Sequence, residues 1–496
     1  MKPVKKLICC LLCGLLFLNI NTSAYATTID AEDDAQRRLS LTVESNEILH
    51  WPSGPTVGAE SAILMEANTG TILYAKNINA RLYPASTTKI LTTLVAIENS
   101  DLSEMVNFST EAVFSIERAS SNMGMDVGQS ITMEQCLYGI LVYSANEVAN
   151  AVAEHIAGSI DGYVDMMNTR AAEIGCTNSH FVTTNGLHDD NHYTSAYDLA
   201  LIAKEFFKNE TLAKISGTKY YKIEPTDTQP DLIELYTHNQ LTNGKYDYEG
   251  YIGGKTGYTS VARQTLVSCA ERNGLKLICV VMKEDSPSQF TDTIALFDYG
   301  FQNFKKMNIS ENEKNYIIDE SDFFKNDSSF FGNNETIMSV NKNNFVVVPN
   351  DVDFPDLTSE LTYDSENNED SVVALIHYYY QGVPIGNAQV LLATDNYYSY
   401  DFESPVIESE NYPANNETDK NIIFINVVKI IFVILCLIVI FLFLIFLRSF
   451  LKSYNFSKKR HRTIFKTKKR EFFRRWKEKH ERKVRNRRLR NRWKHR

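Results

Sequence analysis

Short, strand-like apolar runs on either side of turn residues predict two hairpins that lie far apart in the chain. Two strand-like runs within residues 61–77 flank the turn at 67–70, which is typical of a β-hairpin. Strand-like runs return at 265–270 and 275–282, around Asn273-Gly274, a pair favoured in two-residue hairpin turns.

Between these hairpins, apolar residues recur at helical spacing over 86–97, 132–157 and 195–207. Thr194 or Ser195 supplies an N-cap for the third segment. Strands, then mostly helices, then strands again predict an α+β fold, in which helices cover an antiparallel sheet.

After residue 303 the composition of the chain changes. Asn, Asp and Ser become frequent, and short β-branched runs appear, including 345–348 and 372–380. This pattern predicts a small all-β domain over 304–400. Residues 401–421 are acidic and contain Pro405 and Pro413, which is typical of a stalk.

Two strongly apolar segments lie near the ends of the chain. Residues 7–18 follow three lysines and precede Ala24-Tyr25-Ala26, the pattern of a cleaved secretory signal. As a helix these twelve residues would rise only about 18 Å, too little to span a bilayer. The apolar run 430–447, extended back to 422, is long enough to cross a bilayer.

The formal net charge of −10 hides a division at this second apolar segment. Residues 448–496 hold 23 Lys and Arg against three acidic residues, and the rest of the chain has a net charge of −30. Lys and Arg accumulate on the cytoplasmic side of membrane helices and attract anionic lipids. We therefore expect a single-pass membrane protein with its folded part outside the cell and its tail in the cytoplasm. Interleaved aromatic residues leave nucleic-acid binding by the tail as a weaker alternative, and we do not expect it.

These observations predict the following organisation along the chain: signal peptide 1–26, acidic leader 27–50, peptidase domain 51–303, β-rich domain 304–400, stalk 401–421, transmembrane helix 422–447 and basic tail 448–496. Four cysteines fall in the exported part: Cys136, Cys176, Cys269 and Cys279. Several hairpin registers are compatible with the spacing of Cys269 and Cys279, and only some would bring these two together. Buried free thiols are therefore expected.

The candidate nucleophile is Ser86, because Lys89 lies three residues later on the same expected helix face. A serine needs a base to take its proton, and a lysine serves when its pKa is lowered. Ser-x-x-Lys recurs elsewhere in the chain, for example at Ser216 and Lys219, so this spacing alone identifies nothing.

Two further short patterns complete an ordered set. Ser144-Ala145-Asn146 lies beside a predicted helix, and Lys255-Thr256-Gly257 occurs once, in a predicted strand. Ser-x-x-Lys, Ser-x-Asn and Lys-Thr-Gly in this order are typical of penicillin-binding proteins and class A β-lactamases.

From Trp51 to Gly300 the chain resembles the low-molecular-mass penicillin-binding proteins, the serine D-alanyl-D-alanine carboxypeptidases of peptidase family S11. The resemblance is carried by YPASTTKILTTLVAIE (83–98), SANEVANAVAEHIAGS (144–159), FVTTNGLHDDNHYTSAYDLALIA (181–203) and GGKTGYTS (253–260). It implies a β-lactamase/transpeptidase-like fold. It also implies that the chain removes the terminal D-alanine from peptidoglycan stem peptides and is acylated by β-lactams, with no cofactor.

The resemblance assigns roles to residues of this chain. Ser86 is the expected nucleophile, Lys89 its general base, and Ser144 the relay of a proton to the departing D-alanine. Asn146 lines the opposite wall, and Lys255 and Thr256 bind the substrate carboxylate. Gly257 completes that strand motif, and the backbone of Tyr258 holds the oxyanion together with that of Ser86.

One position departs from the family pattern. Members often carry a basic residue shortly before the Lys-Thr-Gly strand, where an approximate alignment places the neutral Gln240. Carboxylate binding would then depend more on Lys255 and Thr256, with His238 or Arg263 as compensating groups.

The remaining histidines, His155, His188 and His192, are expected to be structural or surface residues, and no cluster has metal-ligand spacing. Two alternatives stay open. A β-lactamase would need rapid deacylation, but the loop at 183–193 offers Asp189 and Asp190 and no glutamate. A catalytically weak wall-binding scaffold gains support only from Gln240.

Overall fold

The computed structural model describes residues 32–117, 119–314, 318–319, 336–363 and 372–392. The expected signal peptide, stalk, transmembrane helix and basic tail lie outside these residues. Within the described ranges, we find no helix long and apolar enough to cross a bilayer.

The strands of the first part are β1 (Ser61–Glu66), β2 (Ile72–Lys76), β3 (Met105–Asn107), β4 (Ser130–Thr132), β5 (Tyr220–Ile223), β6 (Ile233–Tyr236), β7 (Tyr251–Thr259), β8 (Arg263–Arg272) and β9 (Leu275–Glu284). Its helices are η1 (Glu44–Glu47), η2 (Ala85–Thr88), α2 (Lys89–Glu98), α3 (Thr110–Phe114), α4 (Met133–Tyr138), η3 (Gly139–Tyr143), α5 (Asn146–Ala157), α6 (Ile160–Ile174), α7 (Ala196–Lys208), α8 (Glu210–Ser216) and α9 (Ser288–Asn303).

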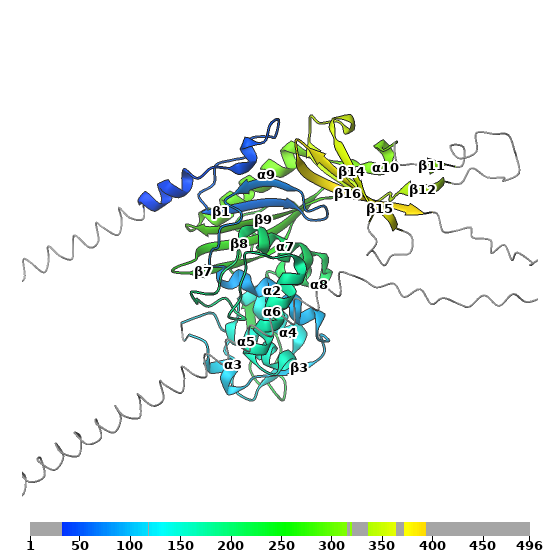
Figure 1. Ribbon diagram of the computed structural model, residues 1–496. Coiled ribbons are helices and arrows are strands. Elements are labelled where there is room, and N and C mark those ends of the chain that lie inside the picture. Colours follow the sequence, from blue (N-terminus) through cyan, green and yellow to red (C-terminus); the bar gives the residue numbers. More distant parts are fainter. Residues whose placement is uncertain (1–31, 118, 315–317, 320–335, 364–371, 393–496) are drawn as a thin grey trace, which may run out of the picture. The chain divides into compact units, whose positions relative to one another are not determined.

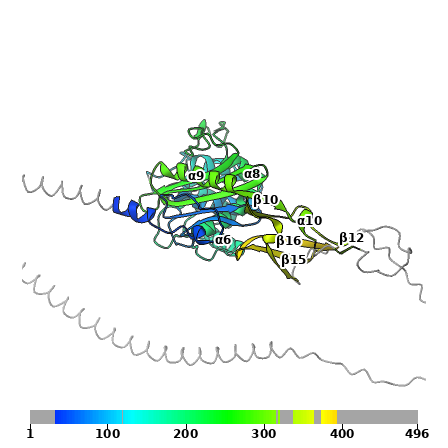
Figure 2. The ribbon, with the colours of Figure 1, turned by 90° about the horizontal axis from the view of Figure 1, so that it is seen from above.

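A five-stranded antiparallel sheet in the order β2-β1-β9-β8-β7 forms the centre of this part. Strand β9 is apolar at nearly every position because both of its faces are buried. Ile278 and Val280 face the helical layer that contains α2 and α7, whereas Leu277 and Val281 face α9. Figure 1 shows these two layers on opposite faces of the sheet, and Figure 2 gives the same ribbon seen from above. The predicted α+β architecture of a sheet covered by helices is confirmed.

Local sequence signals account for several of these boundaries. Asn273 and Gly274 join β8 to β9 with φ values of 51° and 75°, as the two-residue turn requires. Ser195 caps α7 by accepting a hydrogen bond from the backbone of Asp198. In the β8–β9 register Ser268, not Cys269, lies opposite Cys279, and the four cysteines of this part are free thiols as expected.

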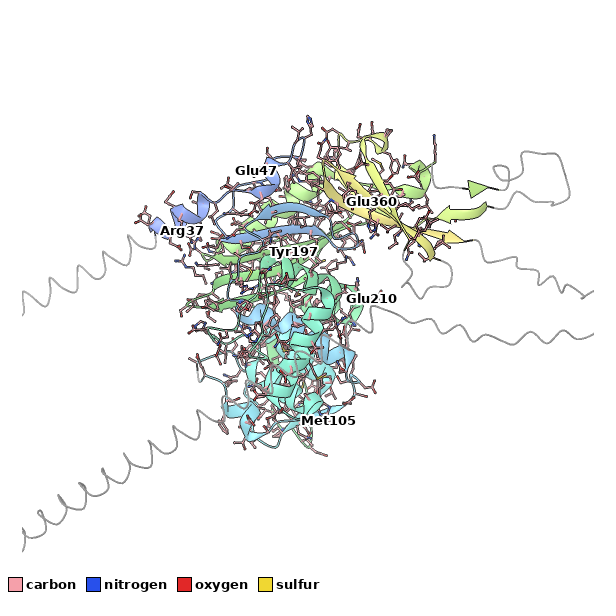
Figure 3. The ribbon with its side chains drawn as sticks, viewed as in Figure 1. Arg37, Glu47, Met105, Tyr197, Glu210 and Glu360 are labelled. Atoms are coloured by element: carbon pink, nitrogen blue, oxygen red, sulfur yellow. The ribbon has the colours of Figure 1, made fainter. Side chains whose placement is uncertain are left out.

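The expected leader is structured where it is described. Residues 32–39 are helical, and Figure 3 shows Arg37 on this helix at the edge of the folded part. Arg37 pairs with Glu60, and the buried Arg38 pairs with Asp285. The carbonyl of Arg38 accepts a 2.8 Å hydrogen bond from buried Lys76. This acidic segment is therefore anchored to the sheet by ion pairs and a buried hydrogen bond.

The described part of the region after residue 303 consists mainly of strands, with two short helices. It comprises β10 (Phe304–Asn308), α10 (Ile309–Asn312), β11 (Ile318–Asp319), β12 (Thr336–Val340), β13 (Phe345–Pro349), η4 (Phe354–Asp356), β14 (Thr358–Thr362), β15 (Val372–Tyr380) and β16 (Val383–Leu392). Strands β11-β12-β16-β15-β14 form one sheet, and β10 pairs with β13. The buried residues of this region join the apolar cluster on the α9 side of the main sheet. In this cluster the rings of Trp51 and Phe304 lie 5.2 Å apart.

Candidate active site

Ser86 lies in the short 3-10 turn η2, and Lys89 begins the α-helix α2 that continues from it. The three-residue spacing places both side chains on one face, so that Lys89 Nζ lies 3.1 Å from Ser86 Oγ. Ser86 is half-buried and lines a cavity, whereas the side chain of Lys89 is fully buried.

The two other contacts of Lys89 indicate how its amine is used. Nζ donates 2.6 Å hydrogen bonds to Asn146 Oδ1 and to the carbonyl oxygen of Asn185. Both are pure acceptors. In the neutral form of the amine they would take both of its N–H groups and leave its lone pair directed at the Ser86 hydroxyl. Burial, and then the charge of Lys255, hold the pKa of Lys89 well below its usual value. The amine therefore has the geometry of a general base, and its lowered pKa favours the neutral form that a base requires.

The expected helix over 132–157 is wrong at one point, and the break forms part of the site. Helix α4 passes into a single π-helical turn, η3, and Ser144 then adopts left-handed φ and ψ values of 67° and 28°. A new helix, α5, begins at Asn146, whose backbone N–H bonds to the carbonyl of Ser121. This turn places Ser144 and Asn146 on the wall of the cavity.

The third motif, Lys255-Thr256-Gly257, lies on β7, an edge strand of the sheet. Lys255 is 3% exposed, and its Nζ donates a 2.8 Å hydrogen bond to the carbonyl of Thr256. Burial lowers the pKa of Lys255 to about 7. Gly257 passes so close to Ser86 that a Cβ there would lie 2.9 Å from the Ser86 nitrogen. The strand therefore packs Gly257 against the nucleophile and carries, two residues before it, a buried amine that is partly protonated near pH 7.

These elements enclose a cavity of about 410 Å³. It is lined by Ser86, Ala119, Ser120, Ser121, Ser144, Asn146, Gly186, Leu187, His238, Gln240, Thr256, Gly257, Tyr258, Thr259, Gln264, Ser286, Gln289 and Phe290. All eight predicted site residues meet here: six line the cavity, and Lys89 and Lys255 are buried beneath its wall.

The position that departs from the family pattern also lies in this cavity. Gln240 and His238 both contribute to its lining, and burial followed by the charge of Lys255 lowers the pKa of His238. Arg263 instead pairs with Asp34 at 3.1 Å and with Asp285 at 2.9 Å, and it is not among the lining residues. Of the two compensating groups suggested by the sequence, only His238 faces the cavity.

Sequence reasoning missed several contributors to the site. The carbonyl of Asn185 binds Lys89, and Gln264 and Gln289 line the cavity from β8 and α9. No residue pattern identifies a backbone acceptor, although Asn185 lies within the segment 181–203 that carried the family resemblance. His155 bonds to Glu104 and His188 lies against Tyr83, and neither histidine is among the residues that line the cavity. The described residues contain no metal-binding cluster of His, Cys, Asp or Glu.

Comparisons with known proteins agree with this geometry. Residues 49–286 match the family of D-alanyl-D-alanine carboxypeptidases. The chain is 34% identical over 309 residues to the D-alanyl-D-alanine carboxypeptidase DacF of Bacillus subtilis, covering 61% of this chain and 72% of DacF. It is also 34% identical to DacB2 of Mycobacterium tuberculosis, covering 50% of this chain and 84% of that protein.

Among solved structures, the chain is similar to penicillin binding protein 5 from Haemophilus influenzae. The TM-score is 0.55 at 26% identity, and the match covers 69% of this chain and 98% of that one.

Proposed function

This chain belongs to the serine D-alanyl-D-alanine carboxypeptidase family, and we propose that it removes the terminal D-alanine from peptidoglycan stem pentapeptides through an acyl-enzyme on Ser86. The 3.1 Å contact between Lys89 Nζ and Ser86 Oγ, at the edge of a cavity that also exposes Ser144 and Thr256, is the observation that carries this proposal.

Acylation follows from the contacts of Lys89. Its neutral amine takes the Ser86 proton as Oγ attacks the carbonyl carbon between the two D-alanines. The backbone N–H groups of Ser86 and Tyr258 stabilise the oxyanion, because preorganised donors act on charge that develops in the transition state. Collapse of the tetrahedral intermediate breaks the peptide bond, and the departing nitrogen receives a proton through Ser144.

Substrate binding uses the strand motif. The ammonium form of Lys255 and the Thr256 hydroxyl bind the terminal carboxylate, and Asn146 lines the facing wall. Water then attacks the ester carbonyl on Ser86 and gives a proton to the Lys89–Ser144 pair. That proton passes to Ser86 Oγ as the ester bond breaks and the shortened peptide is released. A β-lactam follows the same first step, because opening its ring acylates Ser86.

The loop that would distinguish a β-lactamase supports the carboxypeptidase. Of residues 183–193, only Gly186 and Leu187 line the cavity. The Asp189 carboxylate accepts a hydrogen bond from the backbone of Asn191, and Asp190 pairs with His188. Neither acid therefore lies where it could activate a deacylating water. A catalytically weak scaffold is disfavoured by the Ser86–Lys89 contact itself.

We further propose that the chain is exported by its N-terminal signal and held in the cell membrane by residues 422–447. The catalytic part would then face the cell wall, and the cationic tail 448–496 would bind anionic lipids on the cytoplasmic side. The apolar run and the charge division of the sequence support this arrangement. Binding of the full chain to liposomes tests the role of the tail. If binding shows no preference for anionic lipid, the proposed role is refuted and nucleic acid becomes the favoured ligand.

A paired assay tests the proposed reaction on the purified full-length chain. We expect release of D-alanine from a pentapeptide ending in D-Ala-D-Ala, together with covalent labelling by a fluorescent penicillin. Ser86→Ala should abolish both. Labelling that survives this substitution would refute the nucleophile assignment. Rapid turnover of penicillin without D-alanine release would identify a β-lactamase.

A further inference from the structure

His192 is a buried histidine that joins the loop after α6 to the nucleophile turn. It is 2% exposed. Its Nδ1 accepts hydrogen bonds from the backbone N–H groups of Val182 and Thr183, at 2.9 and 3.2 Å. A nitrogen that accepts two N–H groups carries no proton, so the proton of the neutral ring is on Nε2. Burial lowers the pKa of His192 to about 4, which agrees with this neutral form.

The protonated Nε2 faces the turn that holds Ser86. It lies 2.8 Å from Thr88 Oγ1 and therefore donates to that hydroxyl. Thr88 Oγ1 in turn donates a 2.9 Å hydrogen bond to the carbonyl of Ala85. Three successive hydrogen bonds thus run in one direction, from the backbone at 182–183 through the imidazole and the hydroxyl to Ala85.

The Ala85–Ser86 peptide, whose carbonyl accepts the last of these hydrogen bonds, is held in an unfavourable conformation. Ala85 has a φ of 51°, a left-handed value that costs a residue with a Cβ about 1–2 kcal/mol. Because a peptide group is planar, the direction of the Ala85 carbonyl also fixes the direction of the Ser86 N–H. A Cβ on Gly186 or on Gly257 would lie within 3.0 Å of the Ser86 nitrogen. The backbone segments at both glycines therefore pack closely against this peptide.

We propose that His192 is a positioning residue for the oxyanion site. Through Thr88 it holds the Ala85–Ser86 peptide in the orientation that aims the Ser86 N–H at the developing oxyanion. This inference rests on the proposed function, because it assigns His192 to the acylation of Ser86. His192 touches neither the substrate nor the Ser86 hydroxyl, and it transfers no proton.

A donor aimed at the oxyanion acts mainly in the transition state, so loss of its positioning lowers kcat and the acylation rate more than it raises KM. The two ring nitrogens can be tested separately. His192→Gln places an amide N–H near the position of Nε2 and keeps a donor for Thr88. His192→Asn keeps only an acceptor near the position of Nδ1. Thr88→Val removes the hydroxyl with little change of shape, and Thr88→Ser retains it.

The experiment measures kcat and KM for D-alanine release and the rate of penicillin acylation for the full-length variants. We expect His192→Asn and Thr88→Val each to lower kcat and the acylation rate about ten-fold or more, with KM changed less than about two-fold. His192→Gln and Thr88→Ser should stay within about three-fold of the wild type. Because the two side chains form one chain of bonds, the double variant His192→Asn/Thr88→Val should lose no more than the worse single variant.

The matched control is His180→Asn, an exposed histidine of the same loop whose Nδ1 faces the carbonyl of Asn191; it should behave as the wild type. Wild-type acylation rates in both His192→Asn and Thr88→Val would overturn the inference. So would losses that multiply in the double variant, or losses confined to KM. A wild-type chain that neither releases D-alanine nor is labelled at Ser86 would instead refute the proposed function itself.

Discussion

Gly257 and Ser86 approach so closely that a Cβ on Gly257 would lie 2.9 Å from the Ser86 nitrogen and 2.4 Å from Thr265 Oγ1. Thr265 cannot move aside without loss, because its hydroxyl donates a 2.9 Å hydrogen bond to the carbonyl of Pro84. The glycine of the strand motif is therefore required by packing against the nucleophile turn, in addition to any role in substrate binding.

We expect Gly257→Ala to lower penicillin acylation by at least about ten-fold, with a loss of about 1–3 kcal/mol in the free energy of unfolding, as is usual for overpacking. Stopped-flow acylation and chemical denaturation measure the two effects. Adding Thr265→Ala removes the 2.4 Å contact and leaves the one with Ser86. The double variant should regain only part of the stability, because it also loses the Thr265–Pro84 hydrogen bond, and it should stay slow. Recovery of the acylation rate would show that proximity to Ser86 is not the reason.

The role of Lys89 can be separated from its charge. Lys89→Arg keeps a cation that does not deprotonate, and Lys89→Met replaces the side chain with a neutral one of similar length. Both should slow labelling of Ser86 by about 10²–10⁴-fold, the usual contribution of a general base. Thermal unfolding checks that the variants remain folded. A Lys89→Met protein that acylates within ten-fold of the wild type would exclude Lys89 as the base.

The lowered pKa of Lys255 predicts a pH dependence of substrate binding. Below a pH of about 7 the amine is protonated and attracts the substrate carboxylate, whereas above it the buried amine becomes neutral. KM for the pentapeptide should therefore rise as the pH increases beyond 7. Steady-state kinetics between pH 5.5 and about 9 measure this rise. A substrate with an amidated C-terminus serves as the control and should show a flat profile. Equal profiles for the two substrates would contradict the role of Lys255.

The sequence patterns predicted the elements whose formation depends on local signals. The turn at Asn273-Gly274, the cap at Ser195 and the apolar strands of the sheet all depend on residues adjacent in the chain. The motif spacing also predicted which side chains meet, because Ser86 and Lys89 occupy one helical face.

Features that depend on distant partners could not be predicted in this way. The left-handed turn at Ser144 has no glycine or proline of its own, since the nearest glycine, Gly139, lies where α4 passes into η3; the helix that follows starts where Asn146 bonds to the carbonyl of Ser121. Likewise the acidic composition of residues 27–50 suggested only a leader, because Arg38 finds its partner Asp285 far along the chain. Such contacts exist only once the fold has formed.

A buried acid beside the leader, Glu284, and its half-buried neighbour Asp292 provide a last prediction, on stability. Glu284 is 2% exposed, and burial together with a hydrogen bond to Asp292 raises the pKa of its carboxyl. Lys76 lies nearby and donates to the carbonyls of Arg38 and Val57, and the backbone of Gly58 bonds to Asp292. The Glu284 carboxyl therefore keeps its proton in the folded state at pH values where an exposed glutamate would have lost it.

The sign of the effect on stability follows from this proton. Above the ordinary glutamate pKa of about 4.5 the unfolded chain has lost the proton and the folded chain keeps it. The folded state thus binds more protons, and the free energy of unfolding falls as the pH rises from 4.5 through the raised pKa. Glu284→Gln keeps the shape and the donor without titrating, so its stability should decline less over this range. Urea denaturation at pH 5, 6, 7 and about 8 compares the two proteins, with the exposed Glu271→Gln as the matched control. Parallel curves for the wild type and Glu284→Gln would show that Glu284 is ionised in the folded protein.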